Sequence, residues 1–444
     1  MRWRPLVSAY PSSAAGHPSS PRRDPLTSIP VAVVSATRPV ERLVSVLRIR
    51  EFRLLWLVSA AWYAARWVDT VTTGWLALAL TDSPVFLALV GACRMLPLLV
   101  LGIAGGVLAA RVHPRTVLLG AVLAGAAISG WLVVAAALGT LHPWQLVLTT
   151  LGTNTLWALS FPSQRSLVAE TTAGRASLTN ALALDNFVFV GSNVLFSALA
   201  GELIPRTGPQ GAYLLAAGAF LSAVPLLLAL RRPTSAATPA ITRGMEPGYR
   251  AVLSRPVVAG VIVISLVMNG LSLPVIQLLP LVAREVLQVG PVELGRLTSA
   301  WGGGSLLGNA LIFLLAPRRG GLVFFLGSLG AAIGFFAFSL VHSYPLALPL
   351  ILLAGVLMSY FGTFQSALLI EAAGVEGRAK ALGALTVAIG IQPLGVLAIG
   401  WVASLTGPSV AFTAATLAGT VAIAGSAACF PDLLRYRTRL VSER

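Results

Sequence analysis

Charged residues are scarce in this sequence, and that scarcity excludes an ordinary soluble fold. Only 10% of its 444 residues are Asp, Glu, Lys or Arg, against about 25% in soluble globular proteins. The two cysteines, Cys93 and Cys429, both lie within apolar stretches, so neither a disulfide framework nor a thiolate metal site is expected. The four histidines fall in the N-terminal tail or in loops. We therefore predict no metal site and no cofactor.

Apolar residues, by contrast, make up 56% of the chain, and the mean hydropathy is +0.85. They gather in twelve runs, each long enough to cross a bilayer, for which about 20 residues suffice. The sequence thus predicts an all-α integral membrane protein with twelve transmembrane helices. The expected organisation is a disordered basic tail with a short amphipathic lead-in (1–50), a six-helix bundle (51–232), a cytoplasmic linker (233–255), a second six-helix bundle (256–431) and a basic cytoplasmic tail (432–444).

The net charge of +16 does not indicate nucleic-acid binding, because the positive residues follow the membrane topology. Most of the 31 Lys and Arg residues fall on segments that share one side with both termini. Only Arg206, Arg284 and Arg296 fall on the opposite side. Cytoplasmic loops of membrane proteins carry such an excess, so we expect both termini in the cytoplasm and the protein in the plasma membrane.

An internal repeat divides the chain into two halves. Gln164 and Glu170 precede Gly174-Arg175-Ala176, and the same features return about 200 residues later as Gln365, Glu371 and Gly377-Arg378-Ala379. A period of this size indicates two similar halves rather than a solenoid of small units. The two six-helix bundles should therefore be pseudo-symmetric.

The first predicted span carries the most unusual chemistry. Arg66 and Asp69 lie three residues apart on one helical face, and Arg94 of the second span should lie at a similar depth. Charges inside a membrane are costly and usually face a bundle interior or a wet cavity. Two interpretations stay open: an ion network that holds helices together, or a proton-coupling carboxylate with two tuning cations. Asp185 of the fifth span is either a second proton site or the partner of an inner-loop arginine.

The second span ends in a short motif that is informative in combination with the repeat. Gly106, Leu108, Ala109, Arg111 and Arg115 match the loop signature of the major facilitator superfamily, which this chain resembles over about residues 50–430. Ala110 stands where that family has an aspartate. The surrounding sequence is similar to the drug and siderophore exporter branch, which includes the enterobactin exporter and the macrolide efflux proteins.

This resemblance implies two bundles that rock about a central site, with inner loops that latch together in the outward-facing state. Carried over to this sequence, the residues of that cytoplasmic gate are Gly106, Arg111, Arg115, Glu170, Arg175, Arg318, Glu371 and Arg378. The alternative is a set of solvated loop charges that only fix topology.

The function expected from these features is a secondary transporter, not an enzyme, that exports an amphipathic small molecule in exchange for protons. We expect a monomer in the lipid bilayer. The fourth span lacks a central arginine, and Phe196-Ser197 replaces a Gly-Pro pair, so two antiporter features are missing. A lipid or lysolipid flippase and a non-transporting sensor remain alternatives. The predicted substrate cavity comprises Trp62, Asn154, Trp157, Asn269, Gln277, Asn309, Tyr360 and Gln392.

Overall fold

The computed structural model describes residues 45–173, 178–230, 248–315, 317 and 319–437, and these residues contain helices but no strands. Outside the described residues lie 1–44 of the predicted N-terminal segment, 233–247 of the predicted linker, 438–444 of the predicted C-terminal tail, Arg175 and Arg318. The helical elements of the first half are η1 (Val46–Arg48), α2 (Arg50–Thr81), α3 (Pro84–Arg111), α4 (Pro114–Ala137), α5 (Pro143–Thr172) and α6 (Leu178–Ala229). Those that follow are α7 (Tyr249–Leu253), α8 (Pro256–Val267), η2 (Met268–Ser272), α9 (Pro274–Gln277), α10 (Leu279–Leu281), η3 (Val282–Val286), α11 (Pro291–Leu315), α12 (Gly320–Ser339), α13 (Tyr344–Ala372), α14 (Gly374–Gly390), α15 (Gln392–Thr406), α16 (Pro408–Cys429) and α17 (Pro431–Arg435).

Nine of the described helical stretches are long and apolar enough to cross a membrane. One of them, Asn180–Ala229, is 50 residues long and contains two crossings, because Gly208 breaks α6 with a φ of 71° between Pro205 and Pro209. α2 and α5 are 32 and 30 residues long but more polar. With these, and with α8 to η3 and α14–α15 as single crossings, the helices form the predicted twelve-span fold.

Local sequence sets the turns between crossings. Asp82 ends α2 in the left-handed conformation, with a φ of 47°. The Ser83 side chain then accepts a hydrogen bond from the Phe86 N–H and caps α3, whose first residue is Pro84. In the second half, the crossing that starts with α8 is broken by the π-helical turns η2 and η3 and by Pro274 and Pro280.

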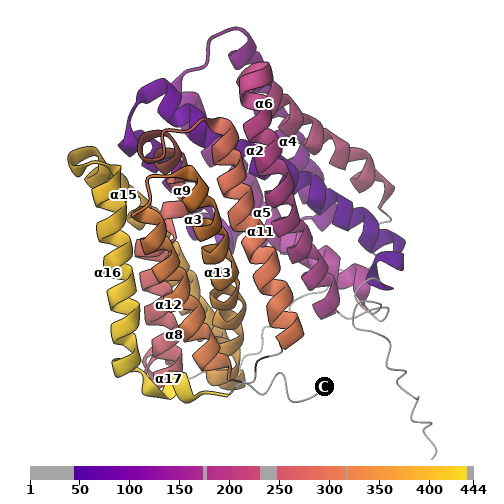
Figure 1. Ribbon diagram of the computed structural model, residues 1–444. Coiled ribbons are helices and arrows are strands. Elements are labelled where there is room, and N and C mark those ends of the chain that lie inside the picture. Colours follow the sequence, from indigo (N-terminus) through magenta and orange to yellow (C-terminus); the bar gives the residue numbers. More distant parts are fainter. Residues whose placement is uncertain (1–44, 174–177, 231–247, 316, 318, 438–444) are drawn as a thin grey trace, which may run out of the picture.

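The crossings pack as two bundles. α2 packs on α6, α3 on α5, and α4 on both α5 and α6; in the second half α13 packs on α11, α12 and α8, and α12 on α16. Two helix pairs, α6 with α11 and α3 with α15, make the main contacts between the bundles (Figure 1). The crossings thus form two helical bodies that meet along a seam, and one cluster of buried apolar residues spans both.

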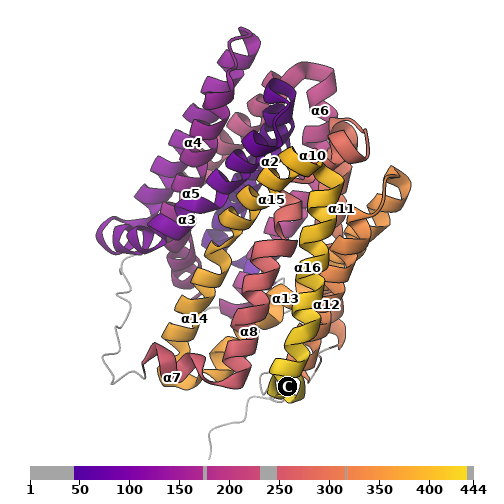
Figure 2. The ribbon, with the colours of Figure 1, turned by 90° about the vertical axis from the view of Figure 1, so that its left-hand side faces the viewer.

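The two bundles diverge towards one end of the molecule. We call the end that holds Val46 and α17 the terminal end, and the end that holds Asp82 and Arg284 the distal end. α6 and α11 meet closely in the distal half, where the Cα atom of Gly201 would lie 3.0 Å from a Cβ on Gly295. Figures 1 and 2 show the N-terminal bundle leaning away from the C-terminal bundle towards the terminal end.

Candidate functional site

Arg66 lies on the inner face of α2 and is held by α5. Its Nη1 donates to Asn154 Oδ1 at 2.8 Å, and its guanidinium lies over the Trp157 ring at 4.6 Å from the centroid. The Asn154 Nδ2 group donates in turn to the Thr150 carbonyl, which fixes the amide orientation. Cation–π and charge-assisted contacts of this kind are strong away from water, so Arg66 is firmly positioned.

Asp69 lies one turn further along α2. Its Oδ1 accepts a hydrogen bond from Thr73 Oγ1 at 2.9 Å, and Thr73 also lies 3.0 Å from the Tyr213 hydroxyl of α6. No described cation forms an ion pair with Asp69 within 4.0 Å. A small cavity with about 20 Å³ of free volume separates Asp69 from Arg66 and Arg94, which is enough for one water molecule.

Arg94 connects the bundles. It projects from α3 and is only 5% exposed, and its Nη1 donates to Gln277 Oε1 of α9 at 3.3 Å. Its Nη2 is buried and has no hydrogen-bond partner. Arg94 and Arg66 line both the small cavity and a second one of about 250 Å³ between the bundles. The two cavities therefore adjoin each other at these two arginine side chains.

Five of the eight predicted cavity residues line a cavity or contact Arg66, and three do neither. Trp62 and Asn154 line the small cavity, and Gln277 and Gln392 line the larger one. Trp157 contacts Arg66, as described above. The other three, which line neither cavity, are Asn269, Asn309 and Tyr360.

Of the three residues that line neither cavity, the two asparagines form hydrogen bonds to backbone carbonyls of their own helices. Asn269 Nδ2 donates to the Ser265 carbonyl, and Asn309 Nδ2 donates to the Ser305 carbonyl, each four residues back. Side chains that satisfy themselves locally in this way are less available for a ligand.

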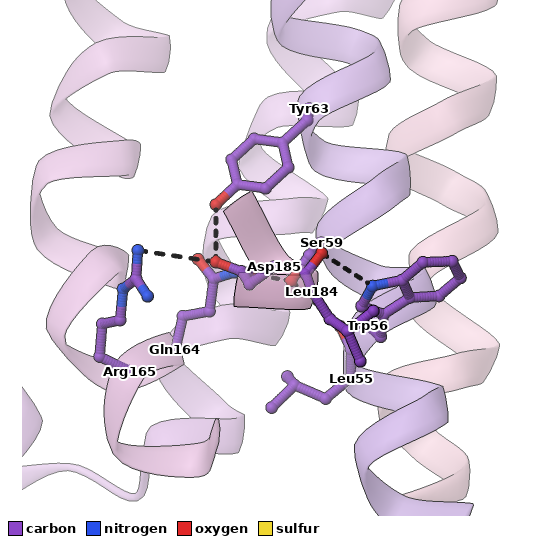
Figure 3. A network of polar contacts seen from close by, with 8 residues as sticks. All are labelled: Leu55, Trp56, Ser59, Tyr63, Gln164, Arg165, Leu184 and Asp185. Carbon is purple, nitrogen blue, oxygen red and sulfur yellow. Dashed lines mark hydrogen bonds and ion pairs between the residues drawn. The ribbon is translucent and has the colours of Figure 1, made fainter. Parts of the chain in front are cut away.

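Asp185 forms a separate polar cluster nearer the terminal end (Figure 3). It is 2% exposed; its Oδ1 accepts from Gln164 Nε2 at 3.2 Å, and its Oδ2 accepts from the Tyr63 hydroxyl at 3.4 Å. Arg165 Nη2 lies 3.6 Å from Oδ2. The arginine beside Asp185 thus comes from α5 rather than from a loop. Two further hydrogen bonds join α2 to α6. The Trp56 indole N–H donates to the Leu184 carbonyl, and the Trp67 indole N–H donates to the Phe189 carbonyl.

Part of this cluster recurs in the second half. Gln164 Nε2 donates to Ser59 Oγ at 2.6 Å, and Gln365 Nε2 donates to Ser265 Oγ at 2.7 Å. The internal repeat therefore extends to side-chain contacts. The position that the repeat pairs with Asp185 holds Ala388, which is buried, so the acidic member occurs in the first half alone.

The predicted gate residues that the structure describes lie at the terminal end. Arg115 donates to the Leu228 carbonyl at 2.8 Å, while Glu170 accepts from Ser166 and Arg111 is exposed. Among described side chains, no ion pair joins Glu170 to Arg111 or Arg115. Of the remaining described gate positions, Gly106 belongs to α3, Glu371 lies at the end of α13, and Arg378 is an exposed residue of α14.

Two direct ion pairs between the bundles lie at the distal end. Arg284 of η3 pairs with Asp82 and donates to the Leu78 carbonyl. Arg296 of α11 pairs with Glu202 of α6 at 2.9 Å. We call these two ion pairs, Asp82–Arg284 and Glu202–Arg296, the distal clasp. It holds the bundles together opposite the end at which they diverge.

Several residues of the larger cavity were not predicted from the sequence. Its polar wall also contains Thr70 and Thr298, and its apolar wall contains Trp67 and Trp301. Thr70 follows Arg66 by four residues, a spacing that indicates the same helical face. The two tryptophans carry no comparable signal, because apolar spans of this chain contain aromatic residues throughout.

Comparison with known proteins identifies the family. A family model described as "Transmembrane secretion effector", which belongs to the major facilitator transporters, matches residues 43–435. The chain belongs to this family. No curated protein matches this transporter in a sequence search.

Solved structures of major facilitator proteins share its fold. A bacterial homologue of the human lysosomal transporter Spinster, in an inward-facing and unoccupied conformation, superposes with a TM-score of 0.66 at 16% identity, over 87% of this chain and 97% of that chain. The nucleoside transporter NupG gives 0.64 at 14% identity, over 88% and 99%. A POT family transporter in complex with a thioalcohol-conjugated peptide gives 0.69 at 12% identity, over 86% and 96%. At these identities the likeness shows the major facilitator fold and not a shared substrate.

Proposed function

We propose that this transporter exports an amphipathic organic compound (a drug, an antibiotic or a siderophore) in exchange for protons, with Asp69 as the proton-binding group. The observation that supports this proposal is the half-buried carboxylate of Asp69 beside two arginines that line a cavity between the bundles. Intramembrane ionisable groups that face a cavity commonly mark proton or substrate pathways. In folds made of two repeated halves, the substrate site likewise lies near mid-membrane between them.

Alternating access would act through the two ends of the molecule. With the distal clasp closed and the bundles diverging at the terminal end, access to the larger cavity would come from the terminal side. The distribution of Lys and Arg favours a cytoplasmic terminal end in the plasma membrane. On that assignment the structure corresponds to an inward-facing state. Breaking the clasp while closing the predicted gate around Arg115 and Glu170 would then give the outward-facing state.

A lipid or lysolipid substrate is the second candidate, and one observation favours it. An apolar groove of about 770 Å³ runs between α2 and α6, lined by residues that include Leu57, Phe196 and Leu214. Leu214 is 62% exposed, so this groove faces the surroundings rather than the seam. An acyl chain is the kind of group that such a surface would hold.

Proton movement in everted membrane vesicles tests the main proposal. Vesicles energised by respiration would be challenged with cationic, macrolide-like, siderophore and lysolipid compounds. We expect substrate-triggered proton release with the wild type and none with Asp69→Asn. Asp432→Asn, which changes an exposed carboxylate of α17, is the matched control and should behave as wild type.

Substrate-triggered proton release that persists in Asp69→Asn would refute the role of Asp69 and make Asp185 the next candidate. Release with the lysolipid alone would favour the lipid candidate. Substrate accumulation without proton release would refute proton coupling.

A further inference from the structure

The buried wall between the bundles contains a hydrogen-bond donor with nothing to bind. Arg94 is 95% removed from solvent, its Nη1 uses Gln277, and its Nη2 has no partner. A buried donor of a charged group is costly when it stays unsatisfied, so such groups normally have a partner in the working protein. The part of the chain that the structure describes supplies none here.

The charges around the two cavities do not balance. Among the described lining residues, Arg66 and Arg94 are positive, and Asp69 is the one acidic residue. Arg66 is satisfied by Asn154 and Trp157, and Asp69 by Thr73. The wall therefore presents one excess positive charge, and the Nη2 of Arg94 is a charged donor of this wall that lacks a partner. In a site of low dielectric constant such a charge attracts an anion strongly.

Apart from Thr70, Thr298 and two glutamines, the uncharged lining of the larger cavity is apolar. Trp67, Phe189 and Trp301 contribute aromatic surface, and Met95 and Met358 contribute flexible thioethers. Met side chains adapt to irregular ligands. The buried Nε1–H of Trp301 also has no partner, which provides a second donor for a ligand acceptor.

We infer that the substrate is an amphipathic anion, whose single negative group binds the free Nη2 of Arg94 and whose apolar body fills the cavity between Trp67, Phe189 and Trp301. The inference rests on the proposed function, since it names the substrate class of the same site. A carboxylate on a soluble aromatic compound and a phosphate on a lysolipid share the required chemistry.

Binding of three matched probes to the full chain in phosphatidylcholine nanodiscs tests this inference. The probes are 1-naphthylacetate, neutral 1-naphthylacetamide and cationic 1-naphthylmethylammonium, measured by equilibrium dialysis. They share the aromatic body and differ in charge. We expect the anion to bind roughly tenfold or more tightly than the neutral probe, as a charge-assisted hydrogen bond would provide.

Two variants should move anion affinity in opposite directions. Arg94→Gln should weaken 1-naphthylacetate roughly tenfold, and Asp69→Asn should tighten it roughly threefold or more because it removes the competing negative charge. Neither should change binding of the neutral probe, which monitors folding of the cavity. Arg94→Lys should keep part of the preference for the anion over the neutral probe. Arg250→Gln, at an exposed position of α7, should keep all of it. A tighter-binding variant cannot be produced by misfolding.

Equal binding of all three probes, no binding of any of them, or an anion preference that persists in Arg94→Gln would overturn the inference. Displacement of 1-naphthylacetate by a lysophosphatidate, but not by other aromatic carboxylates, would identify a lipid headgroup as the source of the anion; the reverse would identify a soluble acid. Flux in the vesicle assay without anion preference would refute this inference alone. Anion binding without flux would refute the transport proposal alone.

Discussion

The distal clasp should control which end of the transporter is open. In Arg284→Gln/Arg296→Gln, both ion pairs between the bundles are lost, together with the bond from Arg284 to the Leu78 carbonyl. The carboxylates left behind remain accessible, since Asp82 is 75% exposed and Glu202 is 27% exposed. The double variant should therefore fold normally and populate the distal-open state more often.

The size of the shift follows from this exposure. Ion pairs with partly exposed partners contribute about 0.2–1 kcal/mol each, and screening by salt reduces that further. Loss of both should change the conformational free energy by about 1 kcal/mol, which corresponds to a roughly fivefold change in the ratio of the two states. The effect should shrink at high ionic strength.

Spin-label distances across the distal end would measure that ratio. Labels at Leu138 and Leu405, both strongly exposed near the distal ends of α4 and α15, report separation of the bundles in a chain without Cys93 and Cys429. Arg206→Gln is the control, because Arg206 pairs with Glu202 within α6 and not across the seam. An unchanged distance distribution in the double variant, or equal widening in the control, would refute the reasoning.

Three further outcomes are expected. Gly295→Ala places a Cβ 2.5 Å from the Ser197 carbonyl, which overpacks α6 against α11, so the thermal unfolding midpoint should fall by the equivalent of about 1–3 kcal/mol. Arg165→Gln and Asp185→Asn should be non-additive in a double-mutant cycle of unfolding midpoints, with a coupling of about 0.5–3 kcal/mol; strict additivity would show that the 3.6 Å contact contributes nothing. Asn154→Leu should lower transport without lowering expression, because Arg66 loses the amide oxygen that orients it.

The fold was predictable because it depends on features that act along the chain. Apolar length, the repeat from Gln164 to Glu371 and the asymmetry of Lys and Arg together predict two bundles of six crossings. α2 shows how polarity complicates this: Arg66 and Asp69 keep it from meeting a simple hydropathy criterion, yet it is a continuous helix of 32 residues.

The site was predictable only in part, because contacts across the seam depend on tertiary packing. The spacing of Arg66 and Asp69 predicts a shared helical face, and both line the small cavity. The bond from Arg94 to Gln277 joins residues 183 positions apart, and nothing in the sequence pairs them. The arginine beside Asp185 was expected to come from an inner loop, whereas Arg165 belongs to α5 and lies 3.6 Å away.

The excess positive charge of the cavity wall makes the membrane voltage part of the transport cycle. On the proposed mechanism, a site that holds a monoanion is electrically neutral, so its reorientation is insensitive to voltage. The substrate-free site returns with a proton on Asp69 and therefore carries the two positive charges of Arg66 and Arg94. One elementary charge moving across 100 mV changes the free energy by about 2.3 kcal/mol. A negative cell interior would thus draw the empty carrier back towards the cytoplasm, and each cycle of export would carry electrical current.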